Sequence, residues 1–552
     1  MEQLPVELLY RIFDNLDAET LLISVRSVCH RFRSITQTYN RFILDYRSIS
    51  KRNFYLLSHR IDRNHVRSLI LSNDKTTSNQ IDLFISFDYF NQLTCLRSLK
   101  LFHIDELQLN ILLQQINPHL LTTFALSIRD YDETYLDHTP RRLTNFLQRS
   151  NLQTIEIHLE NDRFSKISWS NNLSLRHLII HGQITLLNFL SIFQSSPHLN
   201  QLVLSEFPHD LFIQTSSITF PQLCSLTIHD VRTTIDQLET FLLLTPSLIS
   251  LKLIGGKMML NGKRWEDFIT KNLLDLNKFQ FYFTQWELIQ QTERDLQLII
   301  NSFQTPFWIE KKKWFVTCKY DLTLTGTIHL YSIPMCRSYF IYEKGLKVIS
   351  LSTYSNKFFN TENINSLDLI LNKSLANEIE EQTNTNDPLF PEVKQINLEF
   401  YEQWPLFTLE KLSILIDFAR LVRLTIHSNY FNDYNETIWI DISNFLQQSM
   451  NLSNLVIQTS FDTYHSDKTI EHFSSILPDH IKHFEISIQN LKQIQILLHS
   501  CRQLSTITLN NYETKLYDQM IQWFEENTIH STCRISHGMI SVWLGKTIIQ
   551  MG

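Results

Sequence analysis

The chain has 552 residues, of which 43% are hydrophobic and 19% charged, so the composition predicts a folded protein with a large core rather than a disordered chain. The net charge of −7, with no basic block, argues against binding to a nucleic-acid backbone. Only 9 glycines are present, which argues against glycine-rich phosphate loops and against folds that need many close backbone approaches.

The N-terminal segment lacks the positive region of a secretory signal, because the first ten residues contain Glu2 and Glu7 but no lysine or arginine. The most apolar stretch, residues 241–254, is short and interrupted by polar residues, so we expect no membrane span. The seven cysteines are odd in number, widely spaced and without a Cys-x-x-Cys pair, which favours reduced thiols. We therefore expect an intracellular protein, located in the cytoplasm, the nucleus or both.

Residues 4–16 read Leu-Pro-Val-Glu-Leu-Leu-Tyr-Arg-Ile-Phe-Asp-Asn-Leu and predict a helix with a broad apolar stripe. Pro5 suits the first turn, where its missing N–H costs no hydrogen bond. Two more short helices are expected around Leu21 and around Phe32, which gives a helical domain over residues 1–45. A domain of this size has a thin core and gains stability from a partner. The side chains expected to hold its helices together are Phe13, Leu16, Val25, Val28 and Phe32.

This N-terminal pattern resembles the F-box. The matching elements are Leu4-Pro5-x-Glu7-Leu8-Leu9, then Ile12-Phe13 and Leu16, then Ser27-Val28-Cys29-His30-Arg31-Phe32, where Phe32 replaces the usual tryptophan. The resemblance covers under a tenth of the chain. It implies docking on the Skp-family adaptor of an SCF-type cullin–RING ubiquitin ligase. The positions that correspond to the adaptor contact are Leu4, Pro5, Leu8, Leu9 and Ile12. The alternative is an ordinary helical cap on the array that follows.

The rest of the chain repeats the pattern Leu-x-x-Leu-x-Leu, with Ile, Val or Phe allowed. Consecutive starts at 152, 175, 199, 223 and 248 are 23, 24, 24 and 25 residues apart, a period typical of leucine-rich repeats. Each match is short and alternating and therefore predicts a strand. All the matches start at positions 66, 96, 121, 152, 175, 199, 223, 248 and 276, and then at 393, 421, 452, 481 and 504.

Helical segments are expected between these strands, for example over residues 186–194, 235–244, 442–448 and 491–499. One strand and one helix per repeat predict an α/β fold, in which the helical domain is followed by a leucine-rich-repeat-like parallel-sheet solenoid, or horseshoe. The usual asparagine after the strand is mostly absent, so another α/β solenoid is the alternative. The predicted divisions are a first repeat block over 60–284, an insert over 285–392, a second block over 393–512 and a C-terminal cap over 513–552.

The insert breaks the pattern. Residues 286–303 look helical, and the alternating stretches 314–320 and 327–331 predict a β-hairpin with a turn at 322–326. Residues 346–351 suggest another solenoid strand, and the polar stretch 377–388 a surface loop. In the cap, a helix through Met520 and Phe524 is expected, followed by an extended apolar tail.

Between the core positions of each strand, alternate side chains face the other side of the sheet. The column after the third apolar position is mostly uncharged and polar, which suits a protein or peptide partner. It has no cluster of lysine or arginine, so it does not predict phosphate recognition. The candidate contact residues on this face are Phe102, His158, His177, His181, His229, Tyr282, Glu399 and His427. A zinc site built from the three histidines at 158, 177 and 181 is a weaker alternative to exposed histidines, and we predict no metal.

No enzyme motif is complete. Gly545-Lys546-Thr547 resembles the end of a P-loop, but Ile540 occupies the position of the required first glycine. The sequence therefore favours a non-catalytic receptor without a cofactor, which binds a Skp-family adaptor, and through it a cullin, together with a protein to be ubiquitinated. The alternatives are a protein-binding scaffold with no ubiquitin role, and an enzyme with an apolar ligand site near Trp286, Trp308 and Trp314 in the insert.

Overall fold

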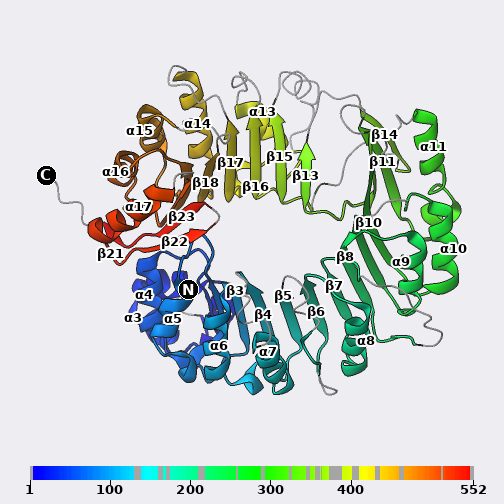
Figure 1. The fold of residues 1–552 in the computed structure, drawn as a ribbon, viewed down its shortest axis with the longest axis horizontal. Helices are drawn as coiled ribbons and strands as arrows, with labels where there is room; N and C mark the ends of the chain where they lie inside the picture. The colour runs from blue at the N-terminus through cyan, green and yellow to red at the C-terminus, as the bar shows by residue number, and fades with distance from the viewer. Residues whose placement is uncertain are drawn as a thin grey trace. The chain divides into compact units, whose positions relative to one another are not determined.

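The computed structural model describes residues 4–129, 138–159, 166–169, 174–208, 218–255, 259–286, 292–321, 326–342, 348–354, 361, 363–371, 388–400, 409–428, 436–458, 465–510, 514–536 and 538–547. The chain divides into two compact units, whose elements are labelled in Figure 1. Unit 1 comprises Met1–His229 and Leu243–Leu248, and unit 2 comprises Asp230–Leu242 and Ile249–Gly552.

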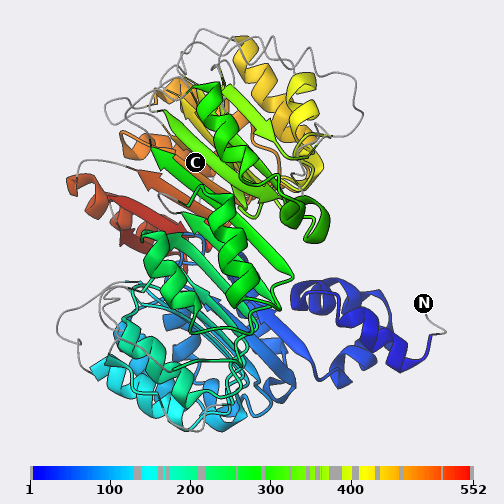
Figure 2. The ribbon, with the colours of Figure 1, turned by 90° about the vertical axis from the view of Figure 1, so that its right-hand side faces the viewer.

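Unit 1 begins with short helices, drawn in dark blue in Figure 2 with the N-terminus at their outer end. They are α1 (Val6–Phe13), the π-helix η1 (Thr20–Val25), α2 (Arg26–Val28) and α3 (His30–Thr38). Pro5 precedes α1 as its N-cap, and its carbonyl accepts hydrogen bonds from the N–H groups of Leu8 (3.1 Å) and Leu9 (3.2 Å). The helical N-terminal region predicted from the sequence is confirmed.

The strands of unit 1 pair in parallel and in chain order, from β1 to β8. The strands are β1 (Phe42–Asp45), β2 (Val66–Ser72), β3 (Ser98–Ile104), β4 (Thr123–Ile128), β5 (Thr154–His158), β6 (His177–His181), β7 (Gln201–Leu204) and β8 (Ser225–Val231). The helices between them are α4 (Lys51–Arg60), α5 (Gln80–Ser86), α6 (Glu106–Gln115), α7 (His138–Gln148) and α8 (Leu186–Ser195), with 3-10 turns η2 (Arg63–His65), η3 (Phe90–Gln92) and η4 (Pro118–Leu120). The sequence did not predict β1, so the sheet starts within the range assigned to the helical domain.

The leucine pattern explains this sheet. In β5 the side chains of Ile155 and Ile157 are fully buried, whereas the alternate positions reach the other face. The leucines that open the matches of β5 and β6, Leu152 and Leu175, lie before their strands and are also buried. Helices then cover this apolar face. Several begin at side-chain caps, such as Asp105 before α6 and Thr185 before α8, which satisfy otherwise unpaired N–H groups.

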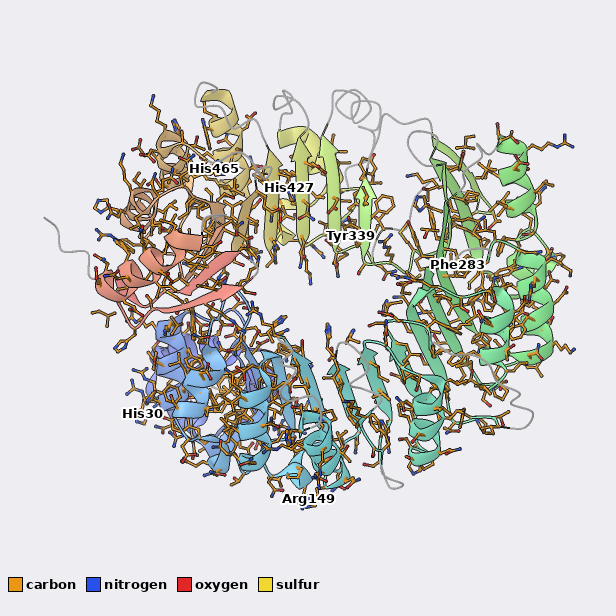
Figure 3. All side chains as sticks on the ribbon, viewed as in Figure 1. His30, Arg149, Phe283, Tyr339, His427 and His465 are labelled. Carbon is orange, nitrogen blue, oxygen red and sulfur yellow. The ribbon has the colours of Figure 1, made fainter. Side chains whose placement is uncertain are left out.

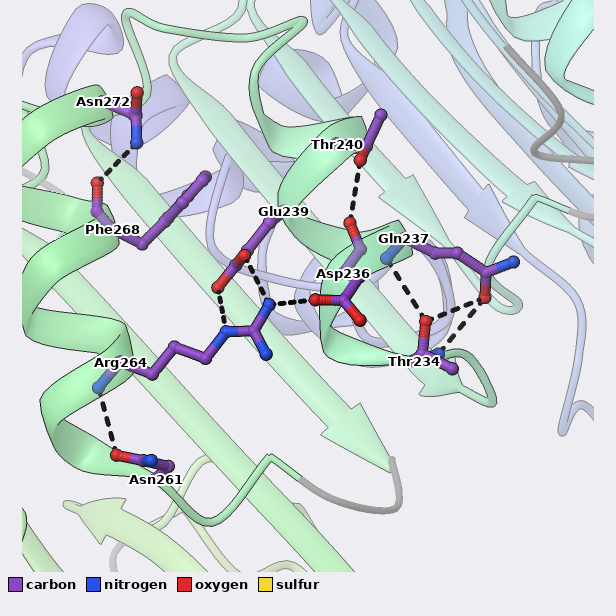
Figure 4. A network of polar contacts seen from close by, with 9 residues as sticks. All are labelled: Thr234, Asp236, Gln237, Glu239, Thr240, Asn261, Arg264, Phe268 and Asn272. Atoms are coloured by element: carbon purple, nitrogen blue, oxygen red, sulfur yellow. Dashed lines mark hydrogen bonds and ion pairs between the residues drawn. The ribbon is translucent and has the colours of Figure 1, made fainter.

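Unit 2 starts with α9 (Ile235–Leu242), β9 (Ser250–Gly255), α10 (Gly262–Asn272) and β10 (Lys278–Trp286). Arg264 of α10 joins the two helices, because its guanidinium bonds to Glu239 at 2.7 and 2.8 Å and also reaches Asp236 (Figure 4). These hydrogen bonds raise the pKa of Arg264. The network therefore ties α9 to α10 within this unit.

The segment predicted as an insert contains α11 (Glu293–Asn301), the π-helix η7 (Phe307–Lys311), β11 (Phe315–Asp321), β12 (Thr327–Ile333) and β14 (Val348–Ser352). The predicted hairpin is confirmed, since β11 and β12 pair antiparallel, although residues 322–325 lie outside the described residues. The predicted helix over 286–303 is shorter, because Trp286 ends β10. The interpretation of residues 346–351 as a solenoid strand is wrong, because β14 pairs antiparallel with β11.

A nine-stranded sheet forms the rest of unit 2, in the order β13-β15-β16-β17-β18-β19-β20-β23-β22. The pairs from β13 to β20 are parallel, and β23 and β22 extend the sheet antiparallel. Its strands are β13 (Tyr339–Tyr342), β15 (Ser366–Leu371), β16 (Gln395–Phe400), β17 (Arg423–Ser428), β18 (Asn454–Gln458), β19 (His483–Ser487), β20 (Thr506–Asn510), β22 (Thr532–Ser536) and β23 (Met539–Trp543). Both β13 and β15 precede residue 393, so this sheet begins inside the predicted insert.

The helices of this part are α13 (Leu409–Leu415), α14 (Glu436–Gln448), α15 (Asp467–Ile476), α16 (Leu491–Ser500) and α17 (Thr514–Asn527), with the 3-10 turn η8 (Phe418–Arg420). A small antiparallel pair, β21 (Thr528–Ile529) and β24 (Lys546–Thr547), follows α17. The predicted C-terminal helix through Met520 and Phe524 is confirmed, and the extended tail supplies β22 and β23. Of the predicted loop over 377–388, residues 377–387 lie outside the described residues.

Every leucine-pattern match overlaps a strand, and the molecule is a mixed α/β protein with large, mainly parallel sheets. Among the described residues, no helix is long and apolar enough to cross a membrane. None of the seven cysteines, all of which are described, forms a disulfide bond, and Cys318, Cys336 and Cys501 are buried.

Candidate protein-binding surfaces

Helix α1 carries apolar side chains on two adjoining strips. Leu9 and Phe13, four residues apart, are 1% and 2% exposed and pack inside the helical region. Leu8 and Ile12, also four residues apart, remain 42% and 36% exposed, and Val6 beside them is 37% exposed. Half of the stripe is therefore used for folding, and the other half faces solvent.

The predicted adaptor residues divide along these strips. Pro5, Leu8 and Ile12 are exposed, Leu4 is half-buried, and Leu9 is buried within its own domain. Burial of Leu9 follows from the helical period, which places it about 100° around the helix from Leu8. Leu9 therefore supports the exposed strip from beneath rather than offering its own side chain to solvent.

Polar contacts hold α1 in place. A guanidinium nitrogen of Arg31, on α3, donates to the carbonyl oxygen of Leu4 at 2.6 Å, which fixes the residue before Pro5. At the other end, the Tyr39 hydroxyl donates to Asp14 Oδ1 at 2.8 Å, and Arg41 bonds to Asp14 Oδ2 at 3.0 Å. Burial and the neighbouring carboxylate raise the pKa of Tyr39. Both ends of the exposed strip are thus anchored to α3 and the residues that follow it.

One residue that was predicted to lie in the core of the helical domain, Val28, is exposed instead. Val28 is 68% exposed, whereas Phe13 and Phe32 are buried as expected. The reason is that the helix is interrupted at Cys29, where the backbone is extended with φ −155°. Cys29 is the N-cap of α3, and its Sγ accepts a hydrogen bond from the Phe32 N–H. This break separates Val28 from the face that Phe32 shares with Ile35. Leu16 and Val25 are half-buried.

The predicted contact column of unit 1 is in register in two stretches, separated by a register shift between β3 and β4. Ser72 pairs with Phe102, Ser127 with His158, and His158 with His181. Phe102 is half-buried, and His158 and His229 are exposed. The rings of His158 and His181 lie 5.6 Å apart between centroids, as neighbouring parallel strands require.

His181 lies in a polar chain across three strands. Its Nδ1 lies 2.9 Å from Ser205 Oγ, and its Nε2 lies 3.5 Å from Glu156 Oε1. The contact with His181 lowers the pKa of Glu156, and the nearby charges of Lys100 and Arg47 add to this effect. The face is therefore polar and internally hydrogen-bonded, and it suits contacts with a protein surface.

The three histidines considered for zinc do not converge. His177 precedes His181 by four residues on the same strand, a span of about 13 Å in extended chain. Its Nδ1 instead lies 2.7 Å from Gln201 Oε1. Among the described residues, no group of three histidine, cysteine, aspartate or glutamate side chains is placed to hold a metal ion.

The column continues in unit 2, where its members differ in exposure. Glu399 and His427 are half-buried register partners on β16 and β17, and His427 pairs with Gln458 on β18. Tyr282 is only 5% exposed, because its ring stacks on Tyr331 with centroids 5.8 Å apart and Arg337 lies over it. Sequence reasoning missed Arg337, which lies in the connection between β12 and β13 and not in a strand column.

The aromatic residues of the insert fill a core. Trp308 is fully buried and Trp314 nearly so, and both contact Phe279 of β10. Their indole N–H groups donate to the carbonyl oxygens of Gly262 and Asn277. These two rings therefore stabilise unit 2 from within. Nothing is described of the Trp286 side chain.

A pocket of about 490 Å³ lies in unit 1 beside β1 and α4. Its lining includes the carboxylates of Asp17, Glu19, Asp45 and Asp74, and Arg47 pairs with Asp45 at 2.6 Å. The lining contains neither histidine nor cysteine.

Comparison with protein-family models identifies an F-box-like domain at residues 1–42. The match covers the four N-terminal helices and ends where β1 begins. F-box domains generally bind Skp-type adaptors. A search of curated proteins finds no match to the chain.

Proposed function

We propose that this chain is the substrate-recognition subunit of an SCF-type cullin–RING ubiquitin ligase. Its F-box-like domain would bind a Skp-family adaptor, and its parallel sheets, as a leucine-rich-repeat-like solenoid in each unit, would bind the protein to be ubiquitinated. The observation that carries the proposal is the strip of Leu8 and Ile12, which stays exposed within a domain that matches the F-box-like family model.

Apolar burial supplies the docking energy in this proposal. A domain of about forty residues cannot cover its own apolar stripe, so a partner groove that covers it stabilises both the domain and the complex. The anchored ends of α1 favour binding further, because the strip is held in one conformation before it meets the adaptor.

The chain itself supplies no catalytic residue and no cofactor in this proposal. A bound substrate would be held near the ubiquitin-loaded enzyme of the ligase, which raises the effective concentration of the reacting lysine. The cytoplasm and the nucleus are the compartments we propose, because cysteines without disulfide bonds suit a reducing environment.

Adaptor capture tests the proposal. The full chain should bind a purified Skp-family adaptor, and the double variant Leu8→Asp, Ile12→Asp should lose this binding, because it places charge in an apolar interface. Leu187→Asp on α8 is the matched control, since Leu187 is 78% exposed and lies outside the helical domain. Equal capture by the double variant and the control would refute the docking strip.

A folded wild-type chain that captures no adaptor would instead favour the scaffold alternative, in which the sheets bind partners without a ubiquitin role. Any truncation used alongside should end before Phe42, because β1 pairs with β2 and its removal would expose a sheet edge.

A further inference from the structure

Arg337 lies between two tyrosine rings in unit 2. Its guanidinium carbon is 5.1 Å from the ring centroid of Tyr282 and 5.1 Å from that of Tyr339, the residue that opens β13 and is labelled in Figure 3. Cation–π contacts of this kind hold a planar guanidinium in a preferred orientation. Arg337 is half-buried, so part of the group remains accessible.

Hydrogen bonds fix both rings. The Tyr339 hydroxyl donates to Asp368 on β15, and the other oxygen of Asp368 accepts from Asn397 Nδ2 at 2.6 Å. The Tyr282 hydroxyl lies 3.1 Å from Nδ1 of His329. The arginine therefore rests on two immobilised rings, which lowers the entropy cost of binding through it.

Two lysines share this region of unit 2. Lys252 on β9 and Lys278 on β10 alternate with the buried Leu251 and Phe279, and the register pairs Ser250 with Lys278, so both lysines lie on the same face of the sheet. Adjacent strands bring such diagonal neighbours within reach of one another. Lys252 is half-buried and Lys278 exposed.

The charges of all three cations act on the buried thiol of Cys336. Burial raises the pKa of its thiol to about 11, and the charges of Lys252, Arg337 and Lys278 each oppose that rise. None of the three forms an ion pair with a carboxylate among the described residues. Arg264 of the same unit, by contrast, pairs with Glu239. Three unpaired positive charges on one face of a chain with net charge −7 make a local anion-attracting site.

We propose that Arg337, Lys252 and Lys278 form a docking site for an acidic segment of a partner protein. The fixed guanidinium would take one anionic group in a bidentate contact, and the two lysines would attract its neighbours. The shared chemistry is a carboxylate or a phosphate on the partner chain. Identification of that partner as the ligase substrate rests on the proposed function.

A protein segment fits this site better than a nucleic acid. Three cations neutralise only about three phosphates, which gives weak binding to a polynucleotide at physiological salt. The ring of Tyr282 is also covered by the guanidinium and by the stacked ring of Tyr331, so it offers no free face for base stacking.

Fluorescence anisotropy of labelled peptides with the full chain tests the site. The probes are a glutamate-rich peptide, its phosphoserine counterpart, its glutamine counterpart and a single-stranded oligonucleotide of equal charge. We expect at least one anionic peptide to bind more tightly than the glutamine peptide and the oligonucleotide, and to weaken as salt rises. The better of the two anionic peptides identifies carboxylate or phosphate as the preferred group.

Two variants test the cations: the single variant Arg337→Gln and the double variant Lys252→Gln, Lys278→Gln. Each should weaken peptide binding about tenfold or more, because each loses at least one charge-assisted hydrogen bond. Lys271→Gln on α10 is the control for loss of an exposed lysine in the same unit. Arg337→Lys keeps the charge without the planar fork and should bind between Arg337→Gln and wild type.

Wild-type binding that ignores charge, or variants that bind as well as the control, would overturn the site, and so would a folded wild-type chain that binds neither anionic peptide. Thermal unfolding of each variant identifies any that fail to fold. Adaptor capture is measured on the same samples. The site variants should lose peptide binding and still capture the adaptor. A wild-type chain that binds the peptide but captures no adaptor would refute the ligase role and leave the anion site supported.

Discussion

The two strips of α1 predict that neighbouring leucines have separable effects. Leu8 and Leu9 are adjacent in sequence, but one is 42% exposed and the other 1%. Truncation of Leu8 should therefore weaken adaptor binding and leave the fold intact. Truncation of Leu9 should destabilise the domain.

The magnitudes follow from the exposed fractions. Full burial of a leucine or isoleucine side chain is worth about 1.5–3 kcal/mol, so the exposed parts of Leu8 and Ile12 together can contribute about 1–2.5 kcal/mol on docking. The double variant Leu8→Ala, Ile12→Ala should thus bind the adaptor about 5- to 50-fold more weakly. Leu9→Ala removes a fully packed side chain and should cost about 2–5 kcal/mol of folding free energy.

Isothermal titration calorimetry against the purified adaptor measures the affinities, and circular dichroism with heating measures stability. Leu187→Ala serves as the control for an exposed leucine outside the domain. The reasoning fails if the Leu8 and Ile12 double variant binds like this control. It also fails if that variant unfolds as early as Leu9→Ala, because the two strips would then not be distinct.

Three further predictions concern the core and its titratable groups. Trp265 is fully buried, so Trp265→Ala should destabilise unit 2 by about 3–5 kcal/mol, measured by denaturant unfolding. Burial lowers the pKa of His465 to about 4, whereas the unfolded chain binds the proton with a pKa near 6.5. The free energy of unfolding should therefore fall by up to about 3 kcal/mol as the pH is lowered from 6.5 to 4. His465→Gln should reduce this pH dependence, measured by melting curves. Maleimide should label Cys95 in the native protein and spare Cys318, because Cys95 is exposed whereas burial raises the Cys318 pKa to about 12; mass spectrometry of the labelled sites would contradict this if Cys318 reacted at a similar rate.

The strands were predictable because each carries the same apolar spacing. The pattern records which side chains must be buried, and burial decides where a strand can lie. Ile364, Leu367 and Leu369, which are buried around β15, carry the same spacing, although no strand was predicted there. The start of the second sheet could thus have been placed earlier from the sequence.

Strand β13 carried no such signal. Its register pairs Tyr339 with Ser366, so two residues earlier Arg337 occupies the position that Ile364 holds in the next repeat. An arginine replaces the opening apolar residue, and Tyr-Phe-Ile-Tyr shows no alternation. β1 and β14 were missed or misassigned for a related reason, because short strands take their direction from a distant partner that local spacing does not reveal.

Arg337, at the position of an apolar repeat residue, also explains why the anion site was not predicted from the strand columns. The columns were drawn for an unbroken array of parallel strands. The predicted contact column contained no cluster of lysine and arginine. The antiparallel hairpin of β11 and β12 interrupts the array, and the chain that leaves β12 brings Arg337 over Tyr282 of β10. The arginine that breaks the repeat pattern is thus the one held between two tyrosines. Local failure of a repeat signal is therefore a useful guide to where such a protein departs from simple packing and can gain a binding site.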